Sequence, residues 1–451
     1  MDGTSFKTRQ ENLLELISEG AVLVSGGNYK QKSHDTDYPF RIHSDFKYLL
    51  GFEEPETLLV MTKNNSGIVR RHLFLRSKDP LMEMWMGKRL GVEKAKDILT
   101  VDETYPVSKI EETLPSILHG HKNLYFDLFN SELCELVTKT TKKLCNKRKE
   151  KAFKPLSWHS VRDLVGTLRL YKDQNEISAI KKAAQLTEVG HRLAMAKTKP
   201  GINEKEISDL LGYIFSQGEG EGPAYDSIVA GGENALILHY IENNQDLQKG
   251  DLILIDAGAQ LNTYASDVTR TFPVDGKFTE AQKEIYSIVL ESQKTAFSVM
   301  KNGSNLTDIH NATSQSLLRS LINHKIVKGE FEENWEKGTI KKYYPHGTGH
   351  WLGLDVHDMC PYYDSHLEDI KLAPGMIFTC EPGLYFSPTD SEIPPQYRGI
   401  GIRIEDDILM TKEGYENLTR SIPKEIKEVE EACQADPKSI LSKLSSLPLL
   451  V

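Results

Sequence analysis

Four short motifs in the second half of this sequence each lie at or beside an apolar run that is typical of a buried strand. Together they carry four carboxylates and one imidazole: Asp256, Asp267, His350, Glu381 and Glu405. Carboxylates held close together in a low-dielectric interior repel one another, and one takes up a proton unless a cation compensates. A fold that brings these side chains together therefore needs something positive to hold them.

The rest of the sequence is that of an ordinary globular protein. Its 451 residues are 39% hydrophobic and 27% charged, which predicts two or three domains with a large core. The net charge of -10 argues against nucleic acid as a partner, and the basic residues 139–151 are interpreted as a solvated helix end and loop. Neither a secretory leader nor an apolar run of about 18 residues is visible, so no membrane partner is expected. Five scattered cysteines favour a reducing compartment, and the predicted location is cytoplasmic.

The patterns of helix and strand divide the chain near residue 170. Residues 1–169 alternate helix-like and strand-like pieces, which indicates an α/β domain. Residues 170–451 combine apolar strands with helices such as the one predicted from Glu176 to about Lys197, which indicates an α+β domain. Thr279 and Gln282 form a possible capping box that predicts the start of another helix. The charged C-terminal tail is predicted to be helical with a frayed end.

The first two motifs form a predicted hairpin. The strand from Leu252 to Ile255 runs into Asp256, and Asp267 follows eleven residues later across a glycine-containing turn. The two carboxylates can therefore face one another. Taken alone, this hairpin is better explained by a pair of turn or capping aspartates.

The other motifs supply the remaining side chains. The segment from His346 to Asp358 holds three histidines and three glycines; glycine permits a close approach, and neutral imidazole is a common metal ligand. An apolar run leads directly into Glu381. Alternation from Gly399 to Met410 predicts one strand with Arg403 and Glu405 on the same side. A solvated polar face is the alternative for this strand.

The chemical types of these side chains indicate the kind of site. Four carboxylates and one imidazole are too many for a structural zinc site, which prefers cysteine and histidine in a tetrahedron. They suit two cations about 3.5 to 4 Å apart that share carboxylates and a water molecule. Such a pair lowers the pKa of the water and polarises a carbonyl, so the motifs predict hydrolysis.

The motifs read LILIDAG with YASDVTRTFPV, HGTGHWLGLDVHD, MIFTCEPGLY and GIGIRIEDDILMT. This series resembles the "pita-bread" metallopeptidase family, which includes methionine aminopeptidase, prolidase and aminopeptidase P. Trp351, the run from Gln396 to Asp407 and the segment from Ser44 to Phe52 are most similar to its Xaa-Pro aminopeptidase (aminopeptidase P) branch. The resemblance covers roughly Phe6 to Glu430. It implies an α/β N-terminal domain and an α+β "pita-bread" catalytic domain.

The resemblance also implies a role for each metal ligand. Asp256 binds one metal ion, Asp267 and Glu405 bridge both ions, and His350 and Glu381 complete the second. Glu381 in addition handles the proton of the attacking hydroxide. The cofactors implied are two divalent ions, manganese in the first place, with cobalt or zinc as alternatives.

Further roles follow from the same resemblance. His239 lies near the substrate, His357 stabilises the tetrahedral intermediate, and His346 and Arg403 line the pocket for the proline. The stretch around Trp85 resembles one that reaches a neighbouring subunit's site, which implies a homo-oligomer, a dimer or a tetramer. A buried aromatic of the N-terminal domain is the alternative for Trp85.

The implied activity is hydrolysis of the N-terminal Xaa-Pro bond by a metal-bridging hydroxide, with peptides that have proline in the second position as partners. Two alternatives are a prolidase, which cuts only Xaa-Pro dipeptides, and a non-catalytic binding protein on the same fold. Thr348, Gly349 and Cys360 depart from the residues usual in the family, which leaves the ligands intact but bears on the local shape of the pocket.

Overall fold

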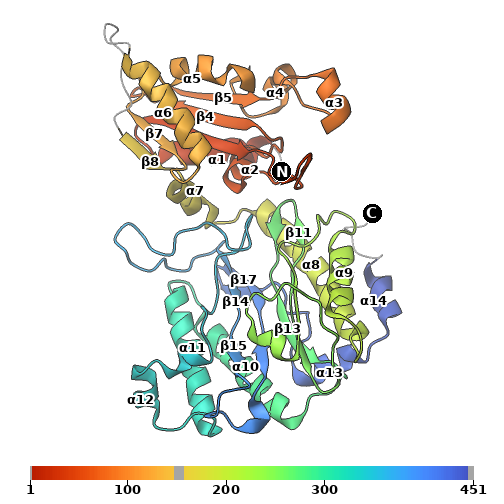
Figure 1. The fold of residues 1–451 in the computed structure, drawn as a ribbon. Helices are drawn as coiled ribbons and strands as arrows, with labels where there is room; N and C mark the ends of the chain where they lie inside the picture. Colours follow the sequence, from red (N-terminus) through yellow and green to blue (C-terminus); the bar gives the residue numbers. More distant parts are fainter. Residues whose placement is uncertain (1–2, 147–156, 445–451) are drawn as a thin grey trace. The chain divides into compact units, whose positions relative to one another are not determined.

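The computed structural model describes residues 3–146 and 157–444, which form two compact units, Met1–Arg169 and Leu170–Val451 (Figure 1). Part of the basic stretch predicted to be a helix end and loop lies outside the described residues; its first residues belong to the helix α6 (Ser131–Asn146). The last residues of the C-terminal tail also lie outside them.

The first unit is built on a six-stranded mixed sheet. Its order is β6-β5-β4-β1-β7-β8, where β1, β4 and β5 are antiparallel neighbours and the outer pairs are parallel. The strands are β1 (Gly20–Gly27), β4 (Thr57–Lys63), β5 (Val69–Leu75), β6 (Glu103–Pro106), β7 (Asn123–Phe126) and β8 (Ser157–Ser160), beside a small hairpin of β2 (Gln31–Ser33) and β3 (Thr36–Asp37).

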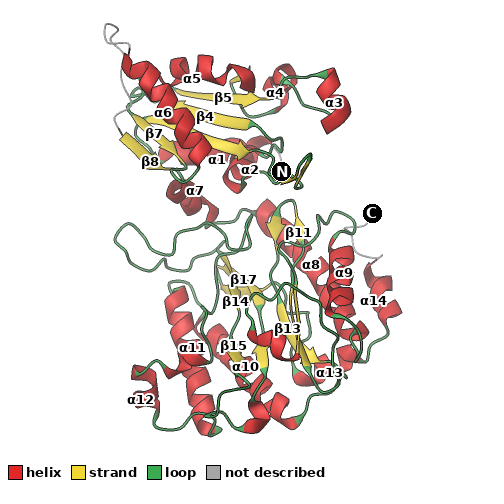
Figure 2. Ribbon diagram, in the orientation of Figure 1, coloured by secondary structure: helices red, strands yellow, loops and turns green. Residues whose placement is uncertain are grey.

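Helices cover both faces of this sheet (Figure 2). Successive side chains of a strand point to opposite faces, so in β1 Ala21 and Leu23 pack with the core under α5 and α6, while α2 packs against the other face. The helices are α1 (Gly3–Glu15), α2 (Ser44–Leu50), α3 (Pro80–Met86), α4 (Val92–Ile98), α5 (Ile110–Leu118), α6 (Ser131–Asn146) and α7 (Arg162–Arg169). The predicted α/β domain is confirmed.

Two long helices of the second unit begin at capping boxes. At the predicted box, the Thr279 hydroxyl accepts from the Gln282 amide, and the Gln282 side chain accepts from the Thr279 amide. Asp173 caps α8 in the same way. The helices are α8 (Gln174–Lys197), α9 (Glu204–Phe215), α10 (Glu280–Val299), α11 (Leu306–Asn323), α12 (Phe331–Glu336), α13 (Ile426–Cys433) and α14 (Pro437–Leu444). The strands lie between α9 on one side and α11 on the other (Figure 2).

The strands of the second unit form small antiparallel sheets. The orders are β13-β10-β9, β14-β17-β18, β15-β16 and β11-β12. The strands are β9 (Ile228–Gly231), β10 (Leu252–Asp256), β11 (Gln260–Leu261), β12 (Tyr264–Ala265), β13 (Thr269–Pro273), β14 (Ile377–Cys380), β15 (Gly383–Tyr385), β16 (Gly401–Arg403), β17 (Asp406–Thr411) and β18 (Gly414–Asn417).

The single strand predicted from Gly399 to Met410 is wrong in one respect. The structure divides it into β16 and β17, which pair with different partners. The break lies at Ile404 and Glu405, where the Ile404 amide donates to the Pro382 carbonyl and the Glu405 amide donates to the Thr269 carbonyl. The change of partner turns the chain from one sheet to another. The alternative of a solvated polar face is wrong as well, because this segment is buried.

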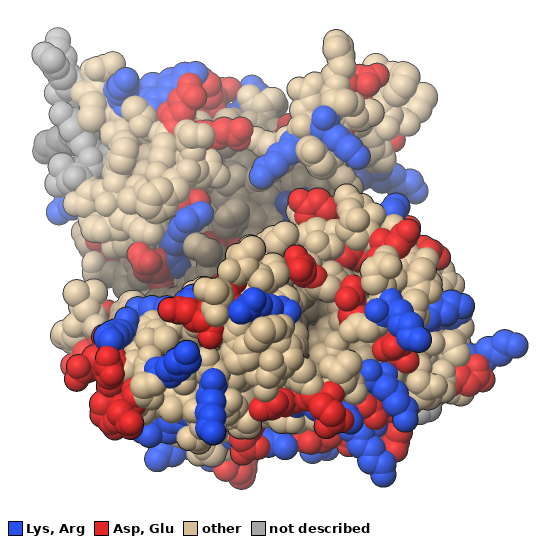
Figure 3. All heavy atoms as spheres, turned by 60° about the horizontal axis from the view of Figure 1, so that its bottom comes forward, with Lys and Arg blue, Asp and Glu red and all other residues tan. Residues whose placement is uncertain are grey.

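One face of the molecule is mixed in charge. On the face drawn in Figure 3, acidic and basic side chains are interspersed rather than gathered into areas of one sign. Among the described residues, no helix combines the length and the apolar character that crossing a membrane requires.

Candidate active site

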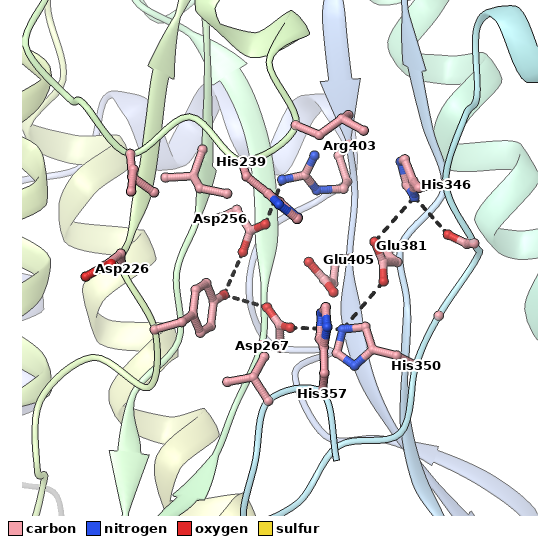
Figure 4. A pocket seen from close by; sticks show the side chains of 17 residues that line it. Asp226, His239, Asp256, Asp267, His346, His350, His357, Glu381, Arg403 and Glu405 are labelled. Carbon is pink, nitrogen blue, oxygen red and sulfur yellow. Dashed lines mark hydrogen bonds and ion pairs between the residues drawn. The ribbon is translucent and has the colours of Figure 1, made fainter. Parts of the chain in front are cut away.

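The predicted site residues of the second unit come together around a cavity of about 590 Å³. The side chains that line it come from the strands β9, β10 and β16 and from the segments next to them. Those segments precede β9, β13, β14 and β17, follow β14, or connect β9 to β10, and Figure 4 shows the labelled side chains around the cavity. They are Tyr225, Asp226, Ile228, Leu238, His239, Ile241, Asp256, Asp267, His346, Gly347, Gly349, His350, Val356, His357, Glu381, Arg403 and Glu405.

Asp256 and Asp267 face one another across the predicted hairpin. Asp256 is the last residue of β10 and lies opposite Thr269 in β13. The hydroxyl of Tyr225 donates to one of the two carboxylates and lies within hydrogen-bonding distance of both, 2.6 Å from Asp256 Oδ1 and 2.5 Å from Asp267 Oδ1. A Cβ at Gly258 would lie 1.7 Å from the Ser266 carbonyl, so the close approach of the two chains requires glycine. The carboxylates point at other side chains rather than capping a turn.

His350 lies beside two of the carboxylates. Its Nδ1 is 3.1 Å from the Trp351 carbonyl and donates to it, which leaves Nε2 directed at Asp267 Oδ2 (3.3 Å) and Glu381 Oε1 (3.6 Å). The backbone of His350 is fixed to β14, because its amide donates to Thr379 Oγ1 and its carbonyl accepts from the Thr379 amide. An imidazole with one nitrogen on a backbone carbonyl and the other directed at carboxylates is oriented as a metal ligand.

Glu381 and Glu405 enter the cavity from the ends of neighbouring strands. Glu381 follows β14 and accepts from Thr379 Oγ1 at 3.1 Å. Glu405 precedes β17, and its Oε2 accepts from Thr269 Oγ1 at 2.6 Å. Asp267, His350 and Glu405 each present a ligand atom, and these atoms all lie within 4.8 Å of one another.

Arg403 is the guanidinium of this cluster and is 4% exposed. It donates to Asp256 Oδ2 at 2.6 Å, to the Tyr385 hydroxyl at 2.9 Å and to Thr269 Oγ1 at 3.0 Å. The Tyr385 hydroxyl in turn lies 2.9 Å from His346 Nε2. Arg403 therefore links the first carboxylate of the cluster to His346.

The electrostatics of the cavity show an excess of negative charge. Burial, together with the charges of Asp267 and Glu381, raises the pKa of Glu405 well above its usual value. Burial also raises the pKa of Glu381 to about 7, against the opposing effect of His350. For His350, burial acts to lower the pKa, but Asp267 and Glu381 prevail and raise it to about 9.

The chemical types of these side chains and the bonds that hold them show whether the site can accommodate a metal ion. Four carboxylates held by neighbouring hydroxyls, together with one imidazole, form a donor set for hard or borderline divalent cations. The described site therefore fits the predicted metal ions.

The two units of the chain match two known protein domains. Residues 178–412 match metallopeptidase family M24, and residues 6–125 match the N-terminal domain of aminopeptidase P. The chain belongs to metallopeptidase family M24. The family resemblance and the fold class predicted from the motifs are confirmed.

Relatives of this M24 chain match it over nearly its full length. The Xaa-Pro aminopeptidase of Escherichia coli (strain K12) is 38% identical over 94% of this chain and 96% of its own. That of Haemophilus influenzae is 40% identical over 92% and 94%. A zinc-substituted E. coli aminopeptidase P in complex with product superposes with a TM-score of 0.92 at 38% identity, covering 96% of this chain and 98% of the other.

Not every predicted residue of this M24 chain lies at the cavity. His239, His346 and His357 line it, and the rings of His357 and His350 lie 4.1 Å apart between centroids. Trp85 is not among the lining residues: it belongs to α3 in the first unit and is 77% exposed. The alternative of a buried aromatic is therefore wrong, because the apolar side chains of α3 face outward.

Three polar residues of the site were not predicted from the sequence. Tyr225 and Asp226 lie in a loop between α9 and β9, and Tyr385 lies at the end of β15. Tyr225 and Asp226 belong to none of the motifs, and Tyr385 ends the motif MIFTCEPGLY without being singled out there. The sequence signal at Tyr225 is weak: a tyrosine followed by an aspartate, close to an apolar run.

Proposed function

We propose that this chain is a dimetal-dependent aminopeptidase that hydrolyses the N-terminal Xaa-Pro bond of peptides. The observation that carries the proposal is the convergence of Asp267, His350 and Glu405 on one point in a cavity that Asp256 and Glu381 also line. The names of the relatives support the same activity. A non-catalytic role is disfavoured because the whole donor set is present.

The proposed metal ligands are the five residues of the motifs, Asp256, Asp267, His350, Glu381 and Glu405. When bound there, divalent cations supply Lewis acidity that activates water and polarises the scissile carbonyl. Manganese is the proposed native ion, with cobalt and zinc as alternatives, because a donor set of four carboxylates and one imidazole is rich in oxygen.

The side chains around the ligands have proposed roles that rest on their positions. Glu381 is the proposed carrier of the proton, since each of its oxygens faces a histidine: Oε2 lies 3.5 Å from His346 Nδ1, and Oε1 lies 3.6 Å from His350 Nε2. His357 and His239 are proposed to donate hydrogen bonds to the oxygen that becomes negative during attack. His346 and Arg403 are proposed to border the pocket for the proline ring.

The exposed side chains of α3 support a homo-oligomer, a dimer or a tetramer. Leu81, Met84 and Trp85 are 63%, 79% and 77% exposed, an unusual density of apolar surface on one short helix. Light scattering on the Trp85→Ser variant tests this, since loss of the larger species is expected. The five free cysteines support a cytoplasmic location.

Peptide hydrolysis tests the proposed activity. The metal-free protein is supplied with manganese and given Ala-Pro-Ala, Ala-Ala-Ala and the dipeptide Ala-Pro. We expect manganese-dependent release of alanine from Ala-Pro-Ala and from neither of the other two peptides. Cleavage confined to the dipeptide would assign a prolidase instead, and a lack of any metal-dependent cleavage would refute the proposal. The Glu405→Gln variant is the inactive control.

A further inference from the structure

The two cavity histidines His346 and His350 are joined by a segment with a single side chain. Between them lie Gly347, Thr348 and Gly349. A Cβ at Gly349 would lie 1.9 Å from the Thr379 carbonyl, so glycine is required where the segment passes β14. Glycine gives the backbone little stiffness of its own. Whatever fixes the segment through a side chain must therefore act through Thr348.

Thr348 is held at three points. It is 3% exposed, and its Oγ1 lies 2.7 Å from the Tyr344 hydroxyl and 3.0 Å from His310 Nδ1. Its carbonyl accepts from the Glu381 amide at 2.8 Å. A hydroxyl has one proton and two lone pairs, so it can satisfy both side-chain partners at once. His310 belongs to α11, and the hydroxyl therefore ties the segment to a helix outside the cavity.

The groups next to this network belong to the site. The ring of Tyr344 packs edge-on against His346, with centroids 4.8 Å apart. Glu381, whose amide bonds to the Thr348 carbonyl, lies between His346 and His350 in Figure 4. The Thr348 hydroxyl therefore supports the segment that carries His346 and His350 and that bonds to the Glu381 amide. None of the bonds of this hydroxyl is directed into the cavity.

We propose that Thr348 is a positioning residue, whose hydroxyl bonds to His310 and Tyr344 hold the His346–His350 segment and the start of Glu381 in the geometry that binds metal. This inference deepens the proposed function and rests on it for the identity of the metal.

The test compares four variants of the full chain. Thr348→Val keeps the shape and removes the hydroxyl, His310→Phe removes the partner nitrogen, and Thr348→Ser keeps the hydroxyl. Thr313→Val is the matched control, because Thr313 is fully buried on the same helix and its hydroxyl bonds only to the Ile309 carbonyl among the hydrogen bonds described. Manganese affinity is measured by calorimetric titration of the metal-free proteins, and thermal unfolding of the same samples is recorded.

We expect Thr348→Val and His310→Phe each to weaken manganese binding about tenfold or more, the range found when partners behind metal ligands are removed. Thr348→Ser and Thr313→Val should bind as the wild type does. The inference is overturned if both of the first two variants bind manganese with wild-type affinity, or if Thr313→Val weakens binding as much as they do. A wild type that binds manganese but cleaves no Xaa-Pro peptide would instead refute the proposed function.

Discussion

Replacing Asp406 by asparagine should destabilise the second unit severely. Asp406 is the first residue of β17 and is fully buried. It accepts from Arg270 at 2.7 Å, from Thr419 Oγ1 at 2.8 Å and from Gln293 at 3.1 Å, and it pairs with Lys424. Burial alone would raise the pKa of this carboxyl, but Arg270 and Lys424 hold it far below its usual value.

The magnitude follows from the charges left behind. Asparagine keeps the shape of the side chain but leaves the fully buried Arg270 without its carboxylate. Breaking a buried ion pair in this way costs about 3–5 kcal/mol. Two charge-assisted hydrogen bonds at about 1.5–3 kcal/mol each lead to the same range. With an m-value of about 3 kcal/mol per M of urea, the midpoint should fall by roughly 1–1.7 M.

Urea unfolding followed by tryptophan fluorescence measures this shift. In a background with Trp85→Phe and Trp158→Phe, the signal comes from the second unit, chiefly from the buried Trp351. Asp209→Asn is the control, because Asp209 pairs with a lysine on the surface of α9 and should change stability by less than about 1 kcal/mol. A midpoint for Asp406→Asn that equals the control's would refute the reasoning.

Three further predictions concern pH, substrate and metal. Burial lowers the pKa of His191 from 6.5 to about 4, so on acidification the unfolded chain takes up the proton before the folded chain does. The contribution of His191 to the free energy of unfolding is therefore full above pH 6.5 and falls by about 3 kcal/mol between pH 6.5 and pH 4. Urea titrations should show this slope in the wild type and not in His191→Gln. Arg403→Lys loses directed bonds to Asp256 and Tyr385, and kcat/KM should fall about 100-fold without loss of fold by circular dichroism. Metal-free Glu405→Gln should unfold at a higher urea concentration than the metal-free wild type, because the substitution removes one of several buried like charges. The same variant should retain less manganese after gel filtration, because it has lost a carboxylate ligand.

The sequence was most informative where chemistry and strand pattern coincide. The apolar run before Asp256 predicted a strand that ends in a carboxylate, and β10 ends at that residue. The capping box at Thr279 predicted the start of α10. In both cases the signal is local, since residues within a few positions of each other determine the element. The bond from Arg403 to Asp256, by contrast, joins residues 147 positions apart.

Other features depend on contacts that no local pattern records. Alternation predicted one strand through Glu405, but pairing with Thr269 on β13 breaks it, and such pairing depends on where a distant strand lies. Tyr225 lies outside the motifs and Tyr385 is only the last residue of one, and their hydroxyls reach the site because the fold brings loop and strand together. Trp85 is exposed because α3 turns its apolar side chains outward, which composition does not reveal.

Two adjacent carboxylates, Glu405 and Asp406, show how the fold separates charge for binding from charge for stability. Glu405 faces the cavity, where burial and the neighbouring carboxylates raise its pKa. Asp406 points the other way, to Arg270 and Lys424, which lower its pKa. Of these two carboxylates, Asp406 is neutralised by cations of the protein itself, and Glu405, which faces the cavity, is the one available to a metal. The two substitutions should therefore have opposite effects on stability. Loss of the charge at Glu405 relieves repulsion among carboxylates, whereas loss of the charge at Asp406 leaves the buried Arg270 and the half-buried Lys424 without their shared counter-charge.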